Sequence, residues 1–398
     1  MCIRDRYSKD DINKLYREIA ASIDISDDMF TAAVDEYESL GKWIDENTPQ
    51  YQISIYPQGS FGLGTVVKPI TDEDDYDLDI VCQFKEQYGL TAKQLKVDVV
   101  KPLLLGYKKT SRDIENKRRC WHVEYAEIPN FHMDVIPAYA NAKLKRINIT
   151  DHDEDHDTYD YIGSNPSGYI TWFFERCARQ QKRLLDSYMK EHGLVVASAD
   201  AEEIKRRKIK TPLQRVVQLL KRHRDIMFAD DDSGNKPISI IITTIAATLY
   251  QEEDNIVDAM TNILLEAPKW INRNKKNGLY YIENPSYPGE NFADKWNTHP
   301  ERATAFFNWV KQATADLTGN QLYQMSRIDM GENVKMCFGE KTGKTVFSKA
   351  AEECRAGVEN GSLKVDRSSG NLSTKGTVSV PTTRHYCLLY TSPSPRDR

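Results

Sequence analysis

The chain has 398 residues, of which 40% are hydrophobic and 28% are charged, and its formal net charge is −5 at pH 7. These values exclude a disordered, collagen-like or disulfide-scaffold protein and leave enough apolar residues for two or three domains. The negative balance argues against a protein whose main task is to grip duplex nucleic acid, although local basic faces remain compatible with it.

The longest nearly apolar stretch, residues 238–250, is too short and too rich in Ser and Thr to span a bilayer. Without a membrane segment or signal peptide, the sequence predicts a cytoplasmic protein. The seven cysteines lie far apart with no CxxC pair. We therefore expect neither a disulfide framework nor a structural zinc site.

The first part of the chain has the pattern of a mixed α/β unit. Apolar residues at helical spacing predict two helices between residues 9 and 46, and Ser26 or Asp27 could cap the second one. The glycine-rich turn 57–64 follows a short strand and should open another helix. The predicted strands cover residues 53–56, 76–82, 121–127 and 131–136.

The pattern changes after the acidic stretch 151–157, which predicts a solvated loop, and becomes mainly helical. Segment 202–210 is basic and predicts an exposed loop or helix end. Residues 268–298 lack periodicity and predict a long, ordered connection. The predicted helices cover residues 167–192, 212–228, 238–251, 254–265 and 300–316.

The two ends of the chain match translated sequencing-adapter DNA. Residues 387–398 begin with Cys-Leu-Leu-Tyr-Thr-Ser, which TGTCTCTTATACACATCT encodes, and residues 1–6 are what the reverse complement encodes. Two such matches, on opposite strands and at opposite ends, are hard to obtain by chance. We expect both segments to be assembly artefacts that are no part of the fold.

Three carboxylates are the strongest indication of a catalytic site. Asp77 and Asp79 stand two apart in a predicted strand, so both side chains point to one face of the sheet. Asp134 lies in another short predicted strand. Carboxylates on adjacent strands suit two divalent cations that bridge a triphosphate and activate a hydroxyl. An isolated Asp-x-Asp pair is common on surfaces, and Asp75 with Asp77 is a rival pair.

The segment before these strands strengthens the metal-site interpretation. Gly59 and Ser60 end a predicted strand and begin a helix, so backbone N–H groups and the Ser60 hydroxyl could face phosphate oxygens. Gly62 and Gly64 would keep the turn narrow. The order Gly-Ser, strand-borne Asp-x-Asp and later strand-borne Asp is far more specific than any of its parts.

With these residues the chain resembles the DNA polymerase β-like nucleotidyltransferase superfamily. Within it, the chain is most similar to the bacterial cGAS/DncV-like nucleotidyltransferases (CD-NTases), which make cyclic oligonucleotide signals in anti-phage defence. The matching segments are 58–69, 77–81, 133–138, 219–224, 236–239 and 337–339.

The resemblance implies an α+β fold, in which a polymerase β-like nucleotidyltransferase lobe with a small mixed sheet packs against a C-terminal helical lobe. The catalytic lobe with its N-terminal helices would cover residues 7–164. The helical lobe would cover residues 165–350, and a C-terminal segment residues 351–386.

The resemblance also implies the roles of the site residues. Two Mg²⁺ or Mn²⁺ ions, held by Asp77, Asp79 and Asp134, would orient one nucleoside triphosphate. Asp134 would help to activate a sugar hydroxyl of a second nucleotide. The residues expected to bind the nucleotide are Gln58, Gly59, Ser60, Lys221 and Ser239.

Two positions depart from the family pattern. Arg or Trp is common where His223 stands, and an aromatic residue often follows the serine where Ile240 stands. Base stacking at this position therefore stays open.

The predicted function is the synthesis of a cyclic di- or trinucleotide second messenger from nucleoside triphosphates, in anti-phage signalling. One alternative is a template-independent nucleotidyltransferase that acts on RNA or protein. Another is a catalytically silent nucleotide-binding regulatory protein, which the intact carboxylate trio speaks against. Separately encoded effector and regulatory proteins are expected partners, a membrane is not, and a nucleic acid activator stays open.

Other features fit chemistry less well. Segment 339–345 resembles a phosphate-binding P-loop but has three residues between its glycines where that loop needs four. His152 and His156 could bind a metal if helical, although an acidic loop is the simpler interpretation. His132, on the same strand face as Asp134, could contact a nucleotide or have no catalytic part.

Basic residues cluster within 108–119 and 205–210, where they could attract nucleotides or simply form a solvated surface. We expect Tyr280, Tyr281 and Trp296 to pack in the core or in loops rather than to stack on bases.

Overall fold

The computed structural model describes residues 7–71, 76–107, 110–125, 131–144, 146–192, 209–362, 364–365, 372–373 and 378–379. The adapter-like ends, the acidic loop with Asp75 and most of the basic segment 202–210 therefore lie outside the described residues.

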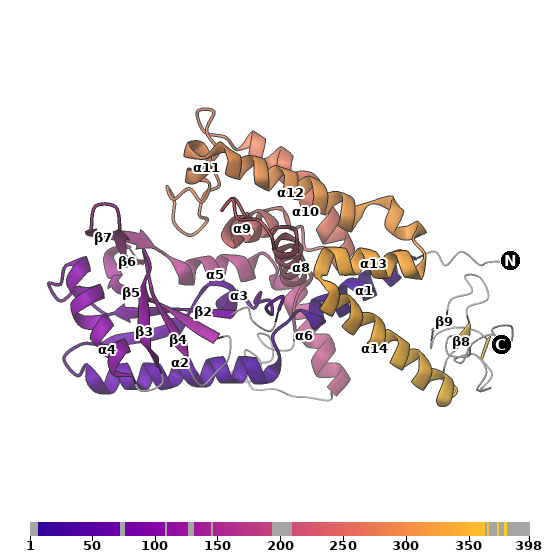
Figure 1. Cartoon of the computed structure of the whole chain (residues 1–398), viewed down its shortest axis with the longest axis horizontal. Coiled ribbons are helices and arrows are strands. Elements are labelled where there is room, and N and C mark those ends of the chain that lie inside the picture. Colours follow the sequence, from indigo (N-terminus) through magenta and orange to yellow (C-terminus); the bar gives the residue numbers. More distant parts are fainter. Residues whose placement is uncertain are drawn as a thin grey trace, which may run out of the picture.

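A mixed seven-stranded sheet forms one end of the molecule (Figure 1). Its strands are β1 (Ile53–Pro57), β2 (Tyr76–Phe84), β3 (Thr110–Asn116), β4 (Trp121–Tyr125), β5 (Phe131–Asn141), β6 (Arg146–Asp153) and β7 (Thr158–Ser164). The order is β1-β2-β5-β4-β3, and the β6–β7 hairpin pairs with the end of β5. β2 and β5 run parallel, whereas β1, β4 and β6 pair antiparallel with their neighbours.

One face of the sheet is covered and apolar. Alternate residues of its central strands, such as Leu78, Met133 and Val123, are fully buried in one cluster. Three helical segments cover this face: α2 (Asp27–Asn47), the π-helical η1 (Gln94–Val100) and α4 (Lys101–Gly106). Because side chains alternate along a strand, the residues between these apolar positions point to the opposite face, where the carboxylates lie.

Helices fill the other end of the molecule (Figure 1). They are α5 (Pro166–Glu175), α6 (Ala178–His192), α8 (Pro212–Met227), α9 (Ser239–Leu249), α10 (Ile256–Arg273), α11 (Asp294–Thr298), α12 (Pro300–Thr318), α13 (Arg327–Phe338) and α14 (Glu340–Glu359). The first helix, α1 (Lys9–Ser22), buries Ile12, Tyr16 and Ile19 in the same core. The predicted domain boundaries stay predictions.

Several shorter elements complete the description. They are α3 (Gly59–Leu63), the 3-10 turns η2 (Ala142–Leu144) and η3 (Asn320–Gln324), and a small sheet of β8 (Lys364–Val365), β9 (Leu372–Ser373) and β10 (Val378–Ser379).

The structure confirms the predicted α+β class with a mixed sheet beside a helical lobe. The break between the first two helices is also as expected, because the Ser26 hydroxyl caps α2 by accepting a hydrogen bond from the Met29 N–H at 3.2 Å. The glycine-rich turn opens α3 as predicted.

Some predicted segments are wrong. Residues 151–157 are not one solvated loop, since β6 runs to Asp153 and the remainder is the turn of a hairpin with β7. The connection expected at 268–298 begins later, because α10 continues through Pro268 to Arg273. Ala267 and Ile271 are buried on that last turn. Their burial offsets the cost of about 3 kcal/mol that a proline inside a helix carries.

The predicted helix 167–192 is two helices, α5 and α6, broken at residues 176–177. The Arg176 guanidinium donates at this break to the carbonyl groups of Ala247 and Tyr250 at 2.8 Å each. Residues 94–106, 110–116 and 327–359 contain helices or a strand that the sequence did not predict.

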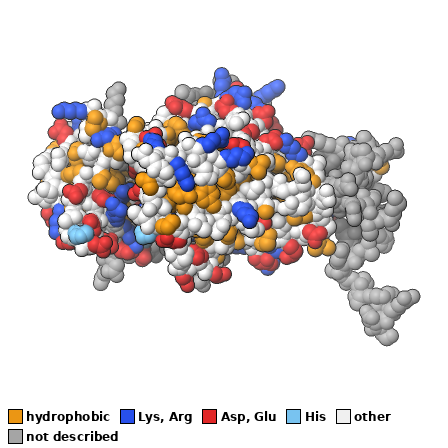
Figure 2. Space-filling view, turned by 90° about the horizontal axis from the view of Figure 1, so that it is seen from above, with side chains coloured by type: hydrophobic (Ala, Val, Ile, Leu, Met, Phe, Trp, Pro, Cys, Tyr) orange, Lys and Arg blue, Asp and Glu red, His pale blue; other side chains and the backbone are white. Residues whose placement is uncertain are grey.

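Charged side chains of both signs are scattered over the visible surface, with hydrophobic side chains between them (Figure 2). Figure 2 shows Lys and Arg side chains interspersed with Asp and Glu side chains over the described part of this face. Within the basic cluster 108–119, Arg118 and Arg119 bind the Asp151 carboxylate at 2.9 and 3.1 Å. Among the described helices, none is both long enough and apolar enough to traverse a bilayer.

A largely buried carboxylate fastens the turn after α1 to α8. Asp24 accepts hydrogen bonds from Lys210 at 2.7 Å, from Arg215 at 3.0 Å and from Gln218 at 3.1 Å. We expect Asp24→Asn to lower the free energy of unfolding by about 3 kcal/mol, because two cations lose their buried counter-charge. Chemical denaturation measures the change. Asp35→Asn, at an exposed position of α2, is the matched control, and an equal loss in both variants would contradict the prediction.

Candidate active site

Polar side chains of three adjacent strands form rows on the face of the sheet opposite its apolar core. The register of β2 and β5 pairs Asp79 with Asp134 and Asp77 with His132, and β4 places His122 beside Asp134. Directly paired residues have Cβ atoms about 5 Å apart. The structure therefore brings the three predicted carboxylates together and adds two imidazoles.

The three carboxylates bring negative charges close together. Burial, with the charges of Asp77 and Asp134, raises the pKa of Asp79 to about 7, and nearby Lys221 opposes this rise. A divalent cation would relieve the same repulsion, and carboxylate oxygens are the ligands that Mg²⁺ and Mn²⁺ accept. The donor set therefore fits the metal that the sequence predicts.

The Gly-Ser turn packs directly against this carboxylate group. Gly59 has a φ of +56°, and a Cβ added there would lie 2.1 Å from Oδ2 of Asp79. The Gln58 N–H donates to the Asp79 carbonyl at 2.8 Å, which ties the end of β1 to β2. Ser60 follows in the first turn of α3 and is half-buried. Glycine is thus required both by the backbone conformation and by the closeness of Asp79.

Helix α8 holds the chain that follows α3. Residues 64–70 lack regular structure, so their carbonyl groups need partners from elsewhere. Gln214, Gln218 and Lys221 donate to carbonyl groups within residues 63–66 at 2.9, 2.7 and 3.1 Å. Lys221 thereby faces the carboxylates from the helical side. Burial and nearby Arg224 lower its pKa to about 8.

Ser239, the first residue of α9, is joined to the same helix. Its hydroxyl accepts a hydrogen bond from Arg224 at 2.8 Å, and Arg224 also donates to the Pro237 carbonyl at 2.9 Å. Arg224 lies three residues after Lys221, so both cations are on one side of α8. Arg224 stands in the matching segment 219–224, but the sequence predicts no role for it.

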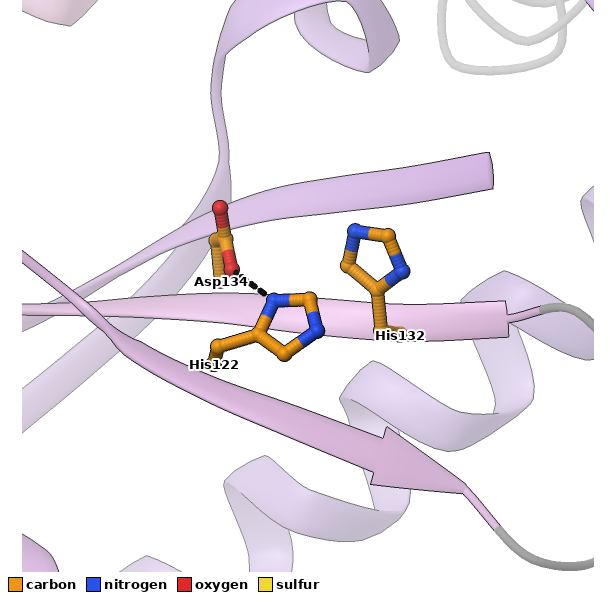
Figure 3. A group of neighbouring side chains, drawn as sticks. All are labelled: His122, His132 and Asp134. Carbon is orange, nitrogen blue, oxygen red and sulfur yellow. Dashed lines mark hydrogen bonds and ion pairs between the residues drawn. The ribbon is translucent and has the colours of Figure 1, made fainter. Parts of the chain in front are cut away.

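His122 is likewise not among the site residues that the sequence predicts. Its Nδ1 lies 2.9 Å from Oδ1 of Asp134, and its ring centroid is 4.1 Å from that of His132 (Figure 3). The available signal was the alternation of β4, where His122 stands between buried Trp121 and Val123. That alternation places His122 on the carboxylate face, but the pairing of β4 with β5 was needed to bring it to Asp134.

His223, where the family pattern differs, points away from the carboxylates. The Trp309 indole N–H donates to Nδ1 of His223 at 3.2 Å, and Nε2 lies 3.1 Å from Asp316. This hydrogen-bond pattern assigns the single ring proton to Nε2, where a metal would have to bind. His223, Asp316 and the neighbouring Cys337 are therefore better described as a packed polar cluster than as a metal site.

The structure also decides features that the sequence left open. The P-loop-like segment consists of Gly339, which separates α13 from α14 at a φ of +95°, and the first turns of α14, whereas a phosphate-binding P-loop follows a strand. His152 is on β6 and His156 is in the turn after it, so they do not share a helix. Trp296 is 5% exposed and packs edge-on against Tyr280, as the core interpretation expects.

Comparison with known proteins identifies the family. Residues 11–176 match the Second Messenger Oligonucleotide or Dinucleotide Synthetase domain. The c-di-GMP synthase of Roseivirga ehrenbergii is 33% identical over 284 residues, which cover 69% of this chain and 70% of that protein. The chain belongs to the CD-NTases. The cyclic dinucleotide synthase CdnG of Bradyrhizobium diazoefficiens is a more distant relative, 23% identical over 87% of this chain and 88% of that protein.

Solved CD-NTase structures share the fold. B. diazoefficiens CdnG in complex with GTP superimposes with a TM-score of 0.68 at 23% identity, covering 86% of this chain and 98% of that chain. CdnC of Escherichia coli MS115-1, in a complex with a HORMA protein, gives a TM-score of 0.54 at 13% identity over 82% and 97% of the two chains. Vibrio cholerae DncV with 3′-deoxy GTP gives 0.51 at 14% over 83% and 86%.

This CD-NTase is therefore a nucleotidyltransferase that makes a cyclic oligonucleotide from nucleoside triphosphates. The comparisons thus confirm the predicted reaction class over transfer to RNA or protein. Enzymes of this family are generally metal-dependent. The roles of the individual site residues stay predictions.

The contact between Gly59 and Asp79 yields a test. We expect Gly59→Ala to slow pyrophosphate release about 100-fold, because a displacement near 1 Å of a reacting group can cost that much. A coupled pyrophosphate assay measures the rate. Gly89→Ala is the matched control, since Gly89 has a φ of +69° but a Cβ there meets nothing within 4 Å in the described part of the chain. Equal slowing by both variants would show that backbone strain, and not the contact with Asp79, causes the loss of rate.

Proposed function

We propose that this CD-NTase makes a cyclic dinucleotide at the carboxylate face of β2 and β5. The observation that carries the proposal is the pairing of Asp79 with Asp134, with Asp77 on the same face of β2. The backbone of Gly59 lies against one side of this group, and Lys221 faces it from α8.

Asp77, Asp79 and Asp134 would hold two divalent ions. When bound, these ions supply charge neutralisation at the reacting phosphate. The raised pKa of Asp79 supports this assignment, because burial and the charges of Asp77 and Asp134 together favour added positive charge at this carboxylate.

The chain's own groups then perform three tasks. Lys221 exchanges the carbonyl of Thr65 for triphosphate oxygens, which satisfy a buried ammonium better than a neutral acceptor does. Ser60, with the backbone of Gln58 and Gly59, contacts the same phosphates from α3. Ser239, held in place by Arg224, adds a hydroxyl from α9.

Transfer requires the second nucleotide to lose a proton. Asp134 accepts that proton from a sugar hydroxyl, whose oxygen attacks the α-phosphate of the first nucleotide, and pyrophosphate leaves with the electrons of the broken P–O bond. A second round within the linear product closes the ring.

Guanine nucleotides are the first substrates to test, because the 33% identical relative is a c-di-GMP synthase. An anti-phage role stays a prediction. The same is true of a separately encoded partner, for which the HORMA protein bound to E. coli CdnC offers one precedent in this family.

The carboxylate assignment is tested by Asp77→Asn with Asp79→Asn. We expect this variant to lose pyrophosphate release from GTP, alone or mixed with ATP, and to form no phosphatase-resistant small product. Labelled nucleotides, phosphatase treatment and chromatography measure both. Asp160→Asn, at an exposed position of β7, is the control on the same sheet. Undiminished release by the double variant would overturn the assignment.

Lys221→Met tests the phosphate contact. Burial lowers the pKa of the Lys221 ammonium, which means that the charged group is costly to bury. We therefore expect the fold to persist when methionine replaces it. The KM for nucleoside triphosphate should rise about 10- to 100-fold, the worth of a charge-assisted hydrogen bond. Steady-state kinetics measure it. Lys269→Met on α10, where Lys269 pairs with Glu266 at an exposed site, should leave KM unchanged.

A further inference from the structure

We propose that His122 and His132, together with Asp134, bind one divalent transition-metal ion, so that one metal position of this enzyme has nitrogen ligands. The proposal depends on the proposed function in one respect, namely that Asp134 belongs to the metal site. The two imidazoles themselves are additional to the predicted carboxylate trio.

The three side chains are spaced as the ligands of one ion are. One ligand atom of each lies within 4.8 Å of the corresponding atoms of the other two. Nδ1 of His122 and Oδ1 of Asp134 are 2.9 Å apart. Metal–ligand bonds of about 2.1 Å place neighbouring ligand atoms about 3 Å apart and opposite ones about 4 Å apart. Figure 3 shows the Asp134 and His132 side chains on one side of β5 and the His122 ring, from β4, beside Asp134.

The strands hold this group rigidly while leaving it open on one side. His122 and Asp134 are directly paired across β4 and β5, and His132 is two residues before Asp134 on β5. Behind them, Trp121 and Met133 are fixed in the apolar core. The His122 and Asp134 side chains are 18% and 24% exposed, which leaves room for water or substrate oxygens as the remaining ligands.

The chemistry of the donors predicts which ions bind. Imidazole nitrogen suits Fe²⁺, Ni²⁺ and Zn²⁺, whereas Mg²⁺ prefers oxygen ligands and bound water. Mn²⁺ also favours oxygen ligands but accepts imidazole more readily than Mg²⁺ does. For His122 to bind through Nδ1, the neutral ring carries its one proton on Nε2 and the hydrogen bond to Asp134 is replaced by two bonds to the same ion. No other proton transfer is required.

Mn²⁺ alone is the probe, used with untagged full-length protein and without nucleotide. Electron spin-echo envelope modulation of the bound ion should show coupling to ¹⁴N. Expressing the protein with ¹⁵N-labelled histidine should replace the ¹⁴N modulation by ¹⁵N modulation. This labelling needs no substitution, so it assigns the nitrogen to imidazole even if a variant misfolds.

The double variant His122→Phe with His132→Phe should lose the nitrogen coupling and bind Mn²⁺ at least about tenfold more weakly. His156→Phe, in an exposed turn where His156 contacts Asp153, is the control and should change neither readout. Bound Mn²⁺ without histidine nitrogen coupling, coupling that survives in the double variant, or no Mn²⁺ binding would each overturn the proposal. Nitrogen-coupled Mn²⁺ in a protein that releases no pyrophosphate would overturn the proposed function instead.

Discussion

The parallel pairing of β2 with β5 is the constraint on which the rest of the site depends. It sets Asp79 beside Asp134 at the centre of the sheet, where burial and the charges of Asp77 and Asp134 raise the pKa of Asp79. Gly59 closes one side of Asp79 without a side chain of its own. Nearby positive charge stabilises the ionised carboxylates, and Lys221 supplies part of it, to which a divalent cation would add.

Helix α8 links this sheet to the helical lobe. It is buried along most of its length, and its buried polar side chains face other parts of the protein instead of solvent. Gln214 and Gln218 satisfy carbonyl groups of the irregular chain after α3, and Lys221 does the same within reach of the carboxylates. A shift of α8 would therefore move the chain after α3 and Lys221 together, which couples packing of the helical lobe to the geometry of the site.

Local chemistry accounts for the parts that could be predicted. The alternation of β2 alone puts Asp77 and Asp79 on one face, and a serine before an acidic first turn is enough to place the start of α2. Long-range contacts account for the failures. Helix α10 passes through Pro268 because Ile271 is buried by neighbouring helices, and the acidic residues of the β6–β7 hairpin are held by pairing and by Arg118.

By itself, the sequence determined which residue types are proposed to bind phosphate and metal, their order along the chain and the face of the strand on which each carboxylate lies. These properties follow from the period of two in a strand and from the backbone freedom of glycine. The tertiary structure decided which strands are neighbours. His122 meets Asp134 through the register of β4 with β5, and Lys221 meets the carboxylates because α8 packs on the chain after α3. Such contacts between distant segments depend on the packing of the whole core, which no local spacing encodes.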